Sequence, residues 1–113
     1  MKILICVEFY DPHVGGAEKH CKLIAEYLNK NNCKVEVATT FIGKRDKEKI
    51  NGVRINEFKI NGNLIRGYSG EITNYQNFLI NSKFDKIIFY AAQQWTFDLS
   101  LEIIDKINSK LIL

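Results

Sequence analysis

Two consecutive glycines near the amino terminus are the feature of this sequence best suited to binding a ligand. Gly15 and Gly16 follow an apolar segment, residues 3–7, and precede a segment with helical periodicity. Glycine has no Cβ, so its backbone can adopt positive φ and approach a ligand closely. The first N–H groups of a helix lack partners within the helix, and a diphosphate is the ligand that suits such a turn best. The alternative is that the two glycines only make a tight strand-to-helix connection.

Three titratable side chains lie beside this glycine pair. His13 changes charge near neutral pH, so it could act as a base or contact a phosphate; an exposed loop histidine without a chemical role is the alternative. Glu18 falls in the first helical turn, where a carboxylate stabilises the helix dipole. A carboxylate there would repel a diphosphate, which favours a structural role for Glu18. His20 is expected at the edge of the helix's apolar stripe, half-buried.

The apolar pattern predicts that a buried parallel sheet positions these residues. Residues 3–7 form a continuous apolar run, as in a central strand covered on both faces. The helix is expected to begin at about Ala17 and to stop at Asn31-Asn32, which tolerate a left-handed conformation. A second strand is predicted at residues 33–40, which alternate and are rich in β-branched side chains. The expected buried stripe of the helix is Ala17, Cys21, Ile24, Ala25 and Leu28.

The middle of the chain is predicted to add a polar loop and a third strand. Residues 43–49 carry mixed charges, which favours a solvated loop; contact with a phosphate or an anionic membrane is the alternative. Asn51-Gly52 is a strong turn signal, and a third strand is expected at residues 53–60. Residues 61–63 are expected to break this strand, and the chain up to Gly70 is expected to be irregular. One face of the third strand should carry Val53, Ile55 and Glu57.

The last third of the chain is predicted to alternate helices and strands. A second helix is expected from Glu71 to Asn81, a fourth strand at residues 85–91, a third helix at residues 97–108 and a fifth strand at residues 110–113. The fold class is therefore α/β, a three-layer, doubly wound parallel sheet with the strand order 3-2-1-4-5. The inward side chains should be Ile72, Tyr75, Phe78 and Leu79 in the second helix and Leu99, Ile103, Ile104 and Ile107 in the third.

In this topology the switch point lies between the first and fourth strands. Ligands of open parallel sheets bind at such a point, outside the carboxyl ends of the strands. Two loops, residues 8–16 and 91–96, would face one crevice there. Any binding site in this domain should be built from these two loops.

Length and composition limit the possible functions. The 113 residues suffice for one domain with a modest core, and the net charge of +3 is spread along the chain without a basic stripe, so no nucleic-acid partner is expected. The three cysteines show no C-x-x-C spacing and are expected to be small buried hydrophobes in a reduced compartment, with no metal site. No segment reads as a signal peptide or a transmembrane span, so a cytoplasmic location is expected.

A resemblance to a known family follows from the amino-terminal third. The segment Pro12-His13-Val14-Gly15-Gly16-Ala17-Glu18, the helix with Leu23, Ala25 and Leu28, and the strand Val35-Glu36-Val37-Ala38-Thr39 together resemble the start of a GT-B glycosyltransferase of the family 4 type. The remainder of the chain is similar to that family only in the order of strands and helices.

The resemblance implies a function and a domain organisation. Residues 1–113 would be part of the amino-terminal, acceptor-side Rossmann-like domain, and the carboxy-terminal donor-binding domain would be absent from this chain. The full enzyme would be retaining and metal-independent, with no cofactor, and would move a sugar from a nucleotide diphosphate sugar to a glycan or lipid-linked acceptor. Gly15 and Gly16 would bind the donor diphosphate. This chain alone is expected to be inactive, and the full enzyme could associate peripherally with the inner membrane face.

The fourth strand departs from the family pattern. That strand often ends in a histidine which contacts the donor sugar or the reacting centre, whereas Tyr90 occupies about that position here. The residues that follow could still bind a sugar, because Gln93 and Gln94 offer amides to hydroxyl groups and Trp95 offers an indole to the C–H face of a ring. Trp95 as a core residue is the alternative.

Other families with similar sheets fit less well. A phosphoacceptor receiver domain needs an aspartate at the end of the third strand, which here ends Phe58-Lys59-Ile60. A dinucleotide-binding enzyme needs G-x-G-x-x-G after the first strand and an acid after the second, which here ends Thr39-Thr40. A P-loop sequence is also missing. A stand-alone carbohydrate- or nucleotide-binding Rossmann-like module without catalysis remains the alternative to a glycosyltransferase.

Overall fold

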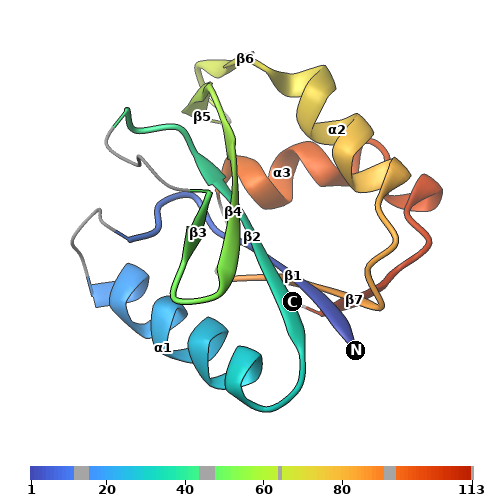
Figure 1. Cartoon of the computed structure of the whole chain (residues 1–113). Coiled ribbons are helices and arrows are strands. Elements are labelled where there is room, and N and C mark those ends of the chain that lie inside the picture. The colour runs from blue at the N-terminus through green and yellow to red at the C-terminus, as the bar shows by residue number, and fades with distance from the viewer. Residues whose placement is uncertain (12–15, 44–47, 64, 91–93, 113) are drawn as a thin grey trace.

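A six-stranded, mostly parallel sheet with helices on both faces forms the centre of the molecule (Figure 1). The computed structural model describes residues 1–11, 16–43, 48–63, 65–90 and 94–112. The strand order is β3-β4-β2-β1-β7-β8, and all neighbours are parallel except β3 and β4. These strands are β1 (Lys2–Cys6), β2 (Lys34–Thr40), β3 (Lys49–Ile50), β4 (Val53–Phe58), β7 (Lys86–Phe89) and β8 (Lys110–Ile112). The predicted α/β class is confirmed, and the architecture is compatible with a Rossmann-like fold.

Three α-helices cover the two faces of this sheet. They are α1 (Gly16–Lys30), α2 (Ile72–Asn81) and α3 (Trp95–Leu101), and a short 3-10 turn, η1 (Ile104–Lys106), follows α3. In Figure 1, α1 lies on one side of the sheet, and α2 and α3 lie on the other. Within the described residues, none of the helices is long and apolar enough to cross a membrane.

Two hydrophobic cores hold the layers together, one on each face of the sheet. Alternate residues of β1 point to opposite faces, so Ile3 and Ile5 face α1 while Leu4 and Cys6 face α2 and α3. All four are at most 4 % exposed, as the continuous apolar run predicted. The α1 core also contains Cys21, Ala25, Val35, Val37, Val53 and Ile55, and the opposite core contains Phe58, Tyr75, Leu79, Phe84, Ile87, Phe89, Trp95 and Leu99.

The two buried cysteines behave as small hydrophobic residues. Burial raises the pKa of the thiols of Cys6 and Cys21 to about 12, so both stay protonated at neutral pH. A protonated, buried thiol is a poor nucleophile and a poor metal ligand. Cys33 is half-buried, and all three cysteines are free thiols.

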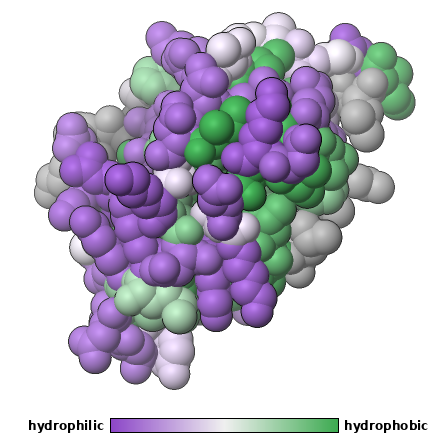
Figure 2. Space-filling view, turned by 90° about the vertical axis from the view of Figure 1, so that its right-hand side faces the viewer, coloured by the Kyte–Doolittle hydropathy of each residue, from purple (hydrophilic) through white to green (hydrophobic). Residues whose placement is uncertain are grey.

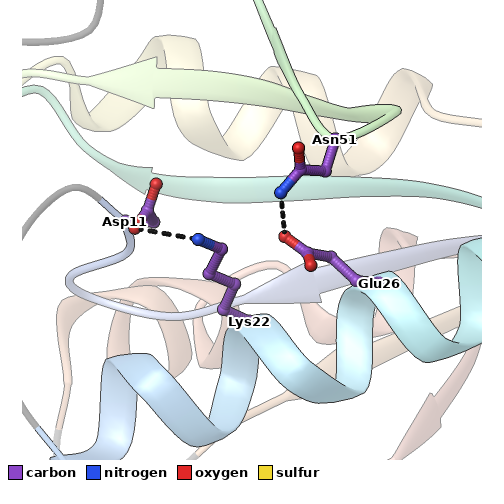
Figure 3. A network of polar contacts seen from close by, with 4 residues as sticks. All are labelled: Asp11, Lys22, Glu26 and Asn51. Atoms are coloured by element: carbon purple, nitrogen blue, oxygen red, sulfur yellow. Dashed lines mark hydrogen bonds and ion pairs between the residues drawn. The ribbon is translucent and has the colours of Figure 1, made fainter.

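Polar contacts attach α1 to two loops at its sides (Figure 3). The ammonium of Lys22 lies 3.3 Å from Asp11 Oδ1, in the segment that follows β1. One turn later on the same helix, Glu26 Oε2 accepts a hydrogen bond of 2.9 Å from Asn51 Nδ2, in the turn between β3 and β4. Partly exposed contacts of this kind contribute at most about 1 kcal/mol each, so they orient α1 more than they stabilise it.

The turn signals at Asn32 and Asn51-Gly52 are confirmed, but the sequence analysis did not predict the hairpin that the second of them makes. Asn32 ends α1 with φ of 68°, as expected, and Asn51 and Gly52 have φ of 50° and 86°. Positive φ at both positions is the type I′ turn that joins two antiparallel strands with matching twist. Lys49 and Ile50 therefore pair with β4 as strand β3 instead of ending a polar loop.

The segment expected to be irregular is a second antiparallel pair. β5 (Ile60–Asn63) and β6 (Gly67–Gly70) pair from Ile60 opposite Gly70 to Asn63 opposite Gly67. The expected third strand of residues 53–60 accordingly ends at Phe58, and Ile60 begins β5. Gly62 and Gly70 have φ of 112° and 110°, conformations that side chains rarely allow, so glycine permits this hairpin instead of breaking it.

The third helix is shorter than predicted. α3 ends at Leu101, and η1 covers residues 104–106. The change from 3.6 to 3.0 residues per turn rotates the later side chains, so Ile104 is 39 % exposed although the helical pattern predicted it to be buried. Leu99 and Ile103 are buried as expected.

Hydrophilic side chains cover much of the surface on the right-hand side of Figure 1. Figure 2 turns that side toward the viewer and shows a smaller hydrophobic area beside the hydrophilic side chains. Among the described residues of the whole surface, the exposed large hydrophobic side chains are Met1, Leu23, Tyr27, Phe41, Ile65, Leu101 and Ile104.

Candidate functional site

The candidate site lies where β1, β2 and β7 end, an edge that we call the carboxyl edge. The chain leaves β1 toward β2 on one side and reaches β7 on the other, so the topological switch point lies between β1 and β7. The two loops predicted to form the site follow these strands. Because parallel strands end at the same edge, residues far apart in sequence meet here.

A hydrogen bond joins the two predicted loops. The N–H of Glu8 donates to Gln94 Oε1 at 2.9 Å, which links the segment after β1 to the residue before α3. The carbonyl of Glu8 accepts bonds from the N–H of Thr40 at 3.0 Å and from the hydroxyl of Thr39 at 2.9 Å. Both the N–H and the carbonyl of Glu8 are therefore hydrogen-bonded, so its backbone is held in one position at the switch point.

The side chain of Glu8 is a half-buried carboxyl group in an acidic setting. Burial raises the pKa of this carboxyl above its ordinary value, and the charge of Glu18 in the first turn of α1 raises it further. A ligand group that donates a hydrogen bond or carries positive charge would stabilise the ionised form of Glu8.

The β5–β6 hairpin supplies a residue that sequence reasoning missed. Tyr68 in β6 donates its hydroxyl hydrogen bond to Asp98 Oδ2 in α3. Burial, this hydrogen bond and the charges of Asp98 and Glu8 raise the pKa of Tyr68 to about 12. Glu8 and Tyr68 thus lie within electrostatic reach of each other although α1 and the strands β2 to β5 lie between them in the chain. No local pattern marks Tyr68, because its position depends on a hairpin that was predicted to be irregular.

Tyr90 contacts α1 instead of pointing alone into the crevice. Its hydroxyl lies 2.7 Å from Nδ1 of His20, and the two rings meet edge to face at 6.0 Å between centroids. Burial raises the pKa of Tyr90, with smaller contributions from Cys21 and Glu18. His20 is exposed, where the sequence suggested a half-buried position.

Trp95 is a core residue, which corrects the expectation that it contacts a sugar ring. It is 2 % exposed, and its indole packs edge to face on Tyr75 at 4.8 Å and on Phe58 at 6.4 Å. Its Nε1–H donates to Thr40 Oγ1 at 2.8 Å. Stacking on a sugar requires an exposed ring face, so this burial argues against that role and makes Trp95 the anchor of the neighbouring Gln94.

The remaining predicted site residues are only partly described. Gly16 is the first residue of α1. His13, Gly15 and Gln93 lie outside the described residues. Gln94 is half-buried, and because Glu8 uses its Oε1, its amide N–H groups are the ones left to donate to a ligand.

The described part of the carboxyl edge favours hydroxyl and ammonium groups over phosphates. Glu8, Glu18 and Asp98 contribute carboxylates, Gln94 contributes an amide, and Tyr68 holds Asp98 in place. No group of three or more potential metal ligands occurs among the described residues. Two open pockets of about 470 and 510 Å³ lie elsewhere, the first at the carboxyl end of α2 and the second along α1. His20 lines the second pocket, but neither pocket is lined by Glu8, Glu18, Tyr68, Gln94 or Asp98.

No known protein family and no curated protein matches this sequence.

Proposed function

We propose that this chain is the acceptor-side part of a glycosyltransferase that moves a sugar from a nucleotide diphosphate sugar to a glycan or lipid-linked acceptor. The single observation that carries the proposal is the bond between Glu8 N–H and Gln94 Oε1, which joins the two loops at the switch point. A second support is the sequence Gly15-Gly16-Ala17-Glu18, on which the resemblance to family 4 enzymes of the GT-B type rests.

The charges of the site support an acceptor role for its described part. Carboxylates such as Glu8 accept hydrogen bonds from sugar hydroxyls, and the amide of Gln94 can donate one back. The same carboxylates repel a diphosphate, so in our proposal only the start of α1 at Gly15 and Gly16 contacts the donor phosphates. The donor's nucleotide would be bound by a second domain facing this edge.

A transfer assay tests this function. The 113-residue chain and a full-length protein that also contains the proposed donor-binding domain are each incubated with a panel of nucleotide sugars and glycan acceptors. Products are detected by mass spectrometry. We expect one sugar to be added to an acceptor by the whole protein and only background hydrolysis by the 113-residue chain. Robust transfer by the 113 residues alone would overturn the two-domain proposal, and absence of transfer by the whole protein would overturn the enzymatic one.

The stand-alone binding module is the competing function, and the same experiment separates the two. A module without catalysis would bind a glycan or a nucleotide but leave the acceptor mass unchanged in every reaction. In the glycosyltransferase, Glu8→Gln should raise the KM for the acceptor more than the KM for the donor, because we place Glu8 on the acceptor hydroxyls.

A further inference from the structure

Four neighbouring strands of the sheet all begin with lysine. Lys2, Lys34, Lys86 and Lys110 are the first residues of β1, β2, β7 and β8, and these strands are adjacent in the order β2-β1-β7-β8. The strands are parallel, so their first residues meet at one edge of the sheet, which we call the lysine edge. The four lysines are far apart in sequence, which is why the sequence shows no basic stripe.

The register brings the lysines into like-charged pairs. Lys2 is the partner of Lys34, and Lys86 is the partner of Lys110. Neighbouring strands lie about 4.8 Å apart, so like charges on partner residues repel one another. Lys34 and Lys110 are exposed, and the other two are half-buried. In the part of the chain that the structure describes, none of the four lysine ammonium groups forms an ion pair with a carboxylate, although the ammonium of Lys2 lies 4.8 Å from the centre of the Phe84 ring. One carboxylate does lie at this edge, because the backbone N–H of Lys2 donates to Asp85 Oδ2 at 2.7 Å, so the lysines outnumber the acids there.

An open pocket continues the lysine edge toward the end of α2. Its volume is about 470 Å³, and exposed Lys83 adds a fifth ammonium group beside Lys2. The side-chain amides of Asn77 and Asn81 can donate hydrogen bonds to an anionic oxygen. The pocket is lined by Lys2, Asn77, Phe78, Asn81, Ser82, Lys83 and Phe84.

The chemistry of this edge fits an anionic lipid surface. Lysines are strongly hydrated point charges without the planar fork with which arginine reads phosphates or bases in a fixed geometry. The ring beside Lys2, Phe84, is 6 % exposed and cannot stack on a nucleotide base, whereas Met1 is 62 % exposed and offers an apolar group at the same edge. Clustered lysines next to an apolar side chain bind diffusely charged lipid head groups.

We propose that the lysine edge docks this protein on a membrane rich in anionic phospholipid. The carboxyl edge lies at the opposite ends of the same strands and carries Glu8, Glu18 and Asp98, which such a membrane repels. The charge distribution therefore orients the molecule, with the lysine edge on the lipid and the candidate site toward the solution, where of the two proposed acceptors the soluble glycan is the one that reaches it.

Vesicle flotation tests this proposal. The probes are vesicles of phosphatidylglycerol and phosphatidylcholine in equal parts and vesicles of phosphatidylcholine alone. Each lysine near an anionic surface contributes about a fivefold gain in partitioning. The variant Lys34→Gln/Lys110→Gln should therefore lose roughly 25-fold in binding to the anionic vesicles, and the wild type should not float with pure phosphatidylcholine.

A matched control removes the same charge from elsewhere. Lys19 and Lys59 are exposed and lie near the carboxyl edge, one in the first turns of α1 and one after β4. Lys19→Gln/Lys59→Gln should keep nearly all of the binding, with circular dichroism showing all variants folded. Equal losses of vesicle binding in the two double variants would mean that only net charge matters. Loss of binding on changing Lys44 and Lys47 instead would assign the contact to residues 43–49. Either result overturns the proposal. So does tight binding to RNA without binding to the anionic vesicles.

Discussion

Removing the hydroxyl of Thr40 should destabilise the fold by leaving the indole N–H of Trp95 without its acceptor. The two groups are 2.8 Å apart, Trp95 is 2 % exposed and Thr40 is 8 % exposed, so water cannot readily replace the lost bond. A buried donor without a partner costs about 1–3 kcal/mol. Thr40→Val keeps the branched shape of the side chain and should lower the free energy of unfolding by that amount. At about 4 °C per kcal/mol for a domain of this size, the melting temperature should fall by roughly 4–12 °C.

The neighbouring residue provides a matched control. Thr39 is also buried in β2, and its hydroxyl donates to the carbonyl of Glu8 at 2.9 Å. That carbonyl keeps a second donor, the N–H of Thr40 at 3.0 Å, so Thr39→Val leaves no buried group unsatisfied. Its cost should be no more than about 0.5 kcal/mol, the lower end of the range for a hydrogen bond.

Urea unfolding followed by far-ultraviolet circular dichroism measures both costs. Trp95 is the only tryptophan in the sequence, so its fluorescence reports separately on the site of the change. In the double variant Thr40→Val/Trp95→Phe both partners are gone, and the loss of stability should be smaller than the sum of the single losses. If Thr40→Val costs no more than Thr39→Val, Trp95 does not depend on Thr40 and our account of how Gln94 is anchored is wrong.

Three further predictions concern the hairpin and the ionisable groups. A Cβ at Gly70, where φ is 110°, would lie 1.9 Å from a backbone oxygen, whereas a Cβ at Gly67 would meet no atom within 4 Å. Urea unfolding should therefore show that Gly70→Ala lowers the free energy of unfolding by roughly 3 kcal/mol or more and Gly67→Ala by about 1 kcal/mol. The pKa of Glu8 is raised in the folded state, so this carboxyl destabilises the fold as pH rises past its ordinary value of 4.5. Glu8→Gln should therefore have a larger free energy of unfolding than the wild type at pH 7, and this difference in stability should vanish in acid. A difference that stays the same across that pH range would contradict the burial of Glu8. Asp98→Asn should lower the pKa of Tyr68 from about 12 toward its ordinary value of 10 without reaching it, because burial is the largest cause of the raised pKa. Ultraviolet titration with Tyr68→Phe as the blank measures this pKa, and an unchanged value would refute the contact between Tyr68 and Asp98.

The layers of the fold could be predicted from the sequence because burial on two faces leaves a local signature. Residues 3–7 are apolar without interruption, and the side chains of α1 recur with helical spacing, as the two observed cores require. The third helix is predicted too long because the same spacing continues to Ile107, while the helix ends at Leu101.

The hairpins could be found only in part, because their strands are stabilised by tertiary contacts. Asn51-Gly52 carries the signal of a type I′ turn, which joins two antiparallel strands. A strand before this turn, β3, could therefore have been predicted. The sequence around Gly62, in contrast, predicts the end of a strand. Its hairpin exists because Ile60, 2 % exposed, packs into the core of α2 and α3.

The sequence predicts that the two loops meet, but not which of their side chains are exposed. The sequence indicates that the loops after β1 and β7 meet, and the bond between Glu8 and Gln94 joins them. Tyr68 reaches the site through the unforeseen hairpin, and Trp95, whose residue type suits a sugar contact, is used as a core residue. Residue types show what a side chain can bind, whereas exposure depends on packing that only the fold determines.

An NMR titration of the 15N-labelled chain with a neutral oligosaccharide tests most directly whether the carboxyl edge is an acceptor site. We expect saturable shifts of the Glu8 backbone amide and of the Gln94 side-chain amide, and no comparable shifts with a phosphorylated sugar. Gln94→Glu keeps an oxygen for the Glu8 N–H but removes the amide donor, so it should abolish binding, whereas the control Asn77→Asp at an exposed position of α2 should not. Saturable shifts confined to other parts of the sheet, or equal binding by Gln94→Glu, would contradict the account.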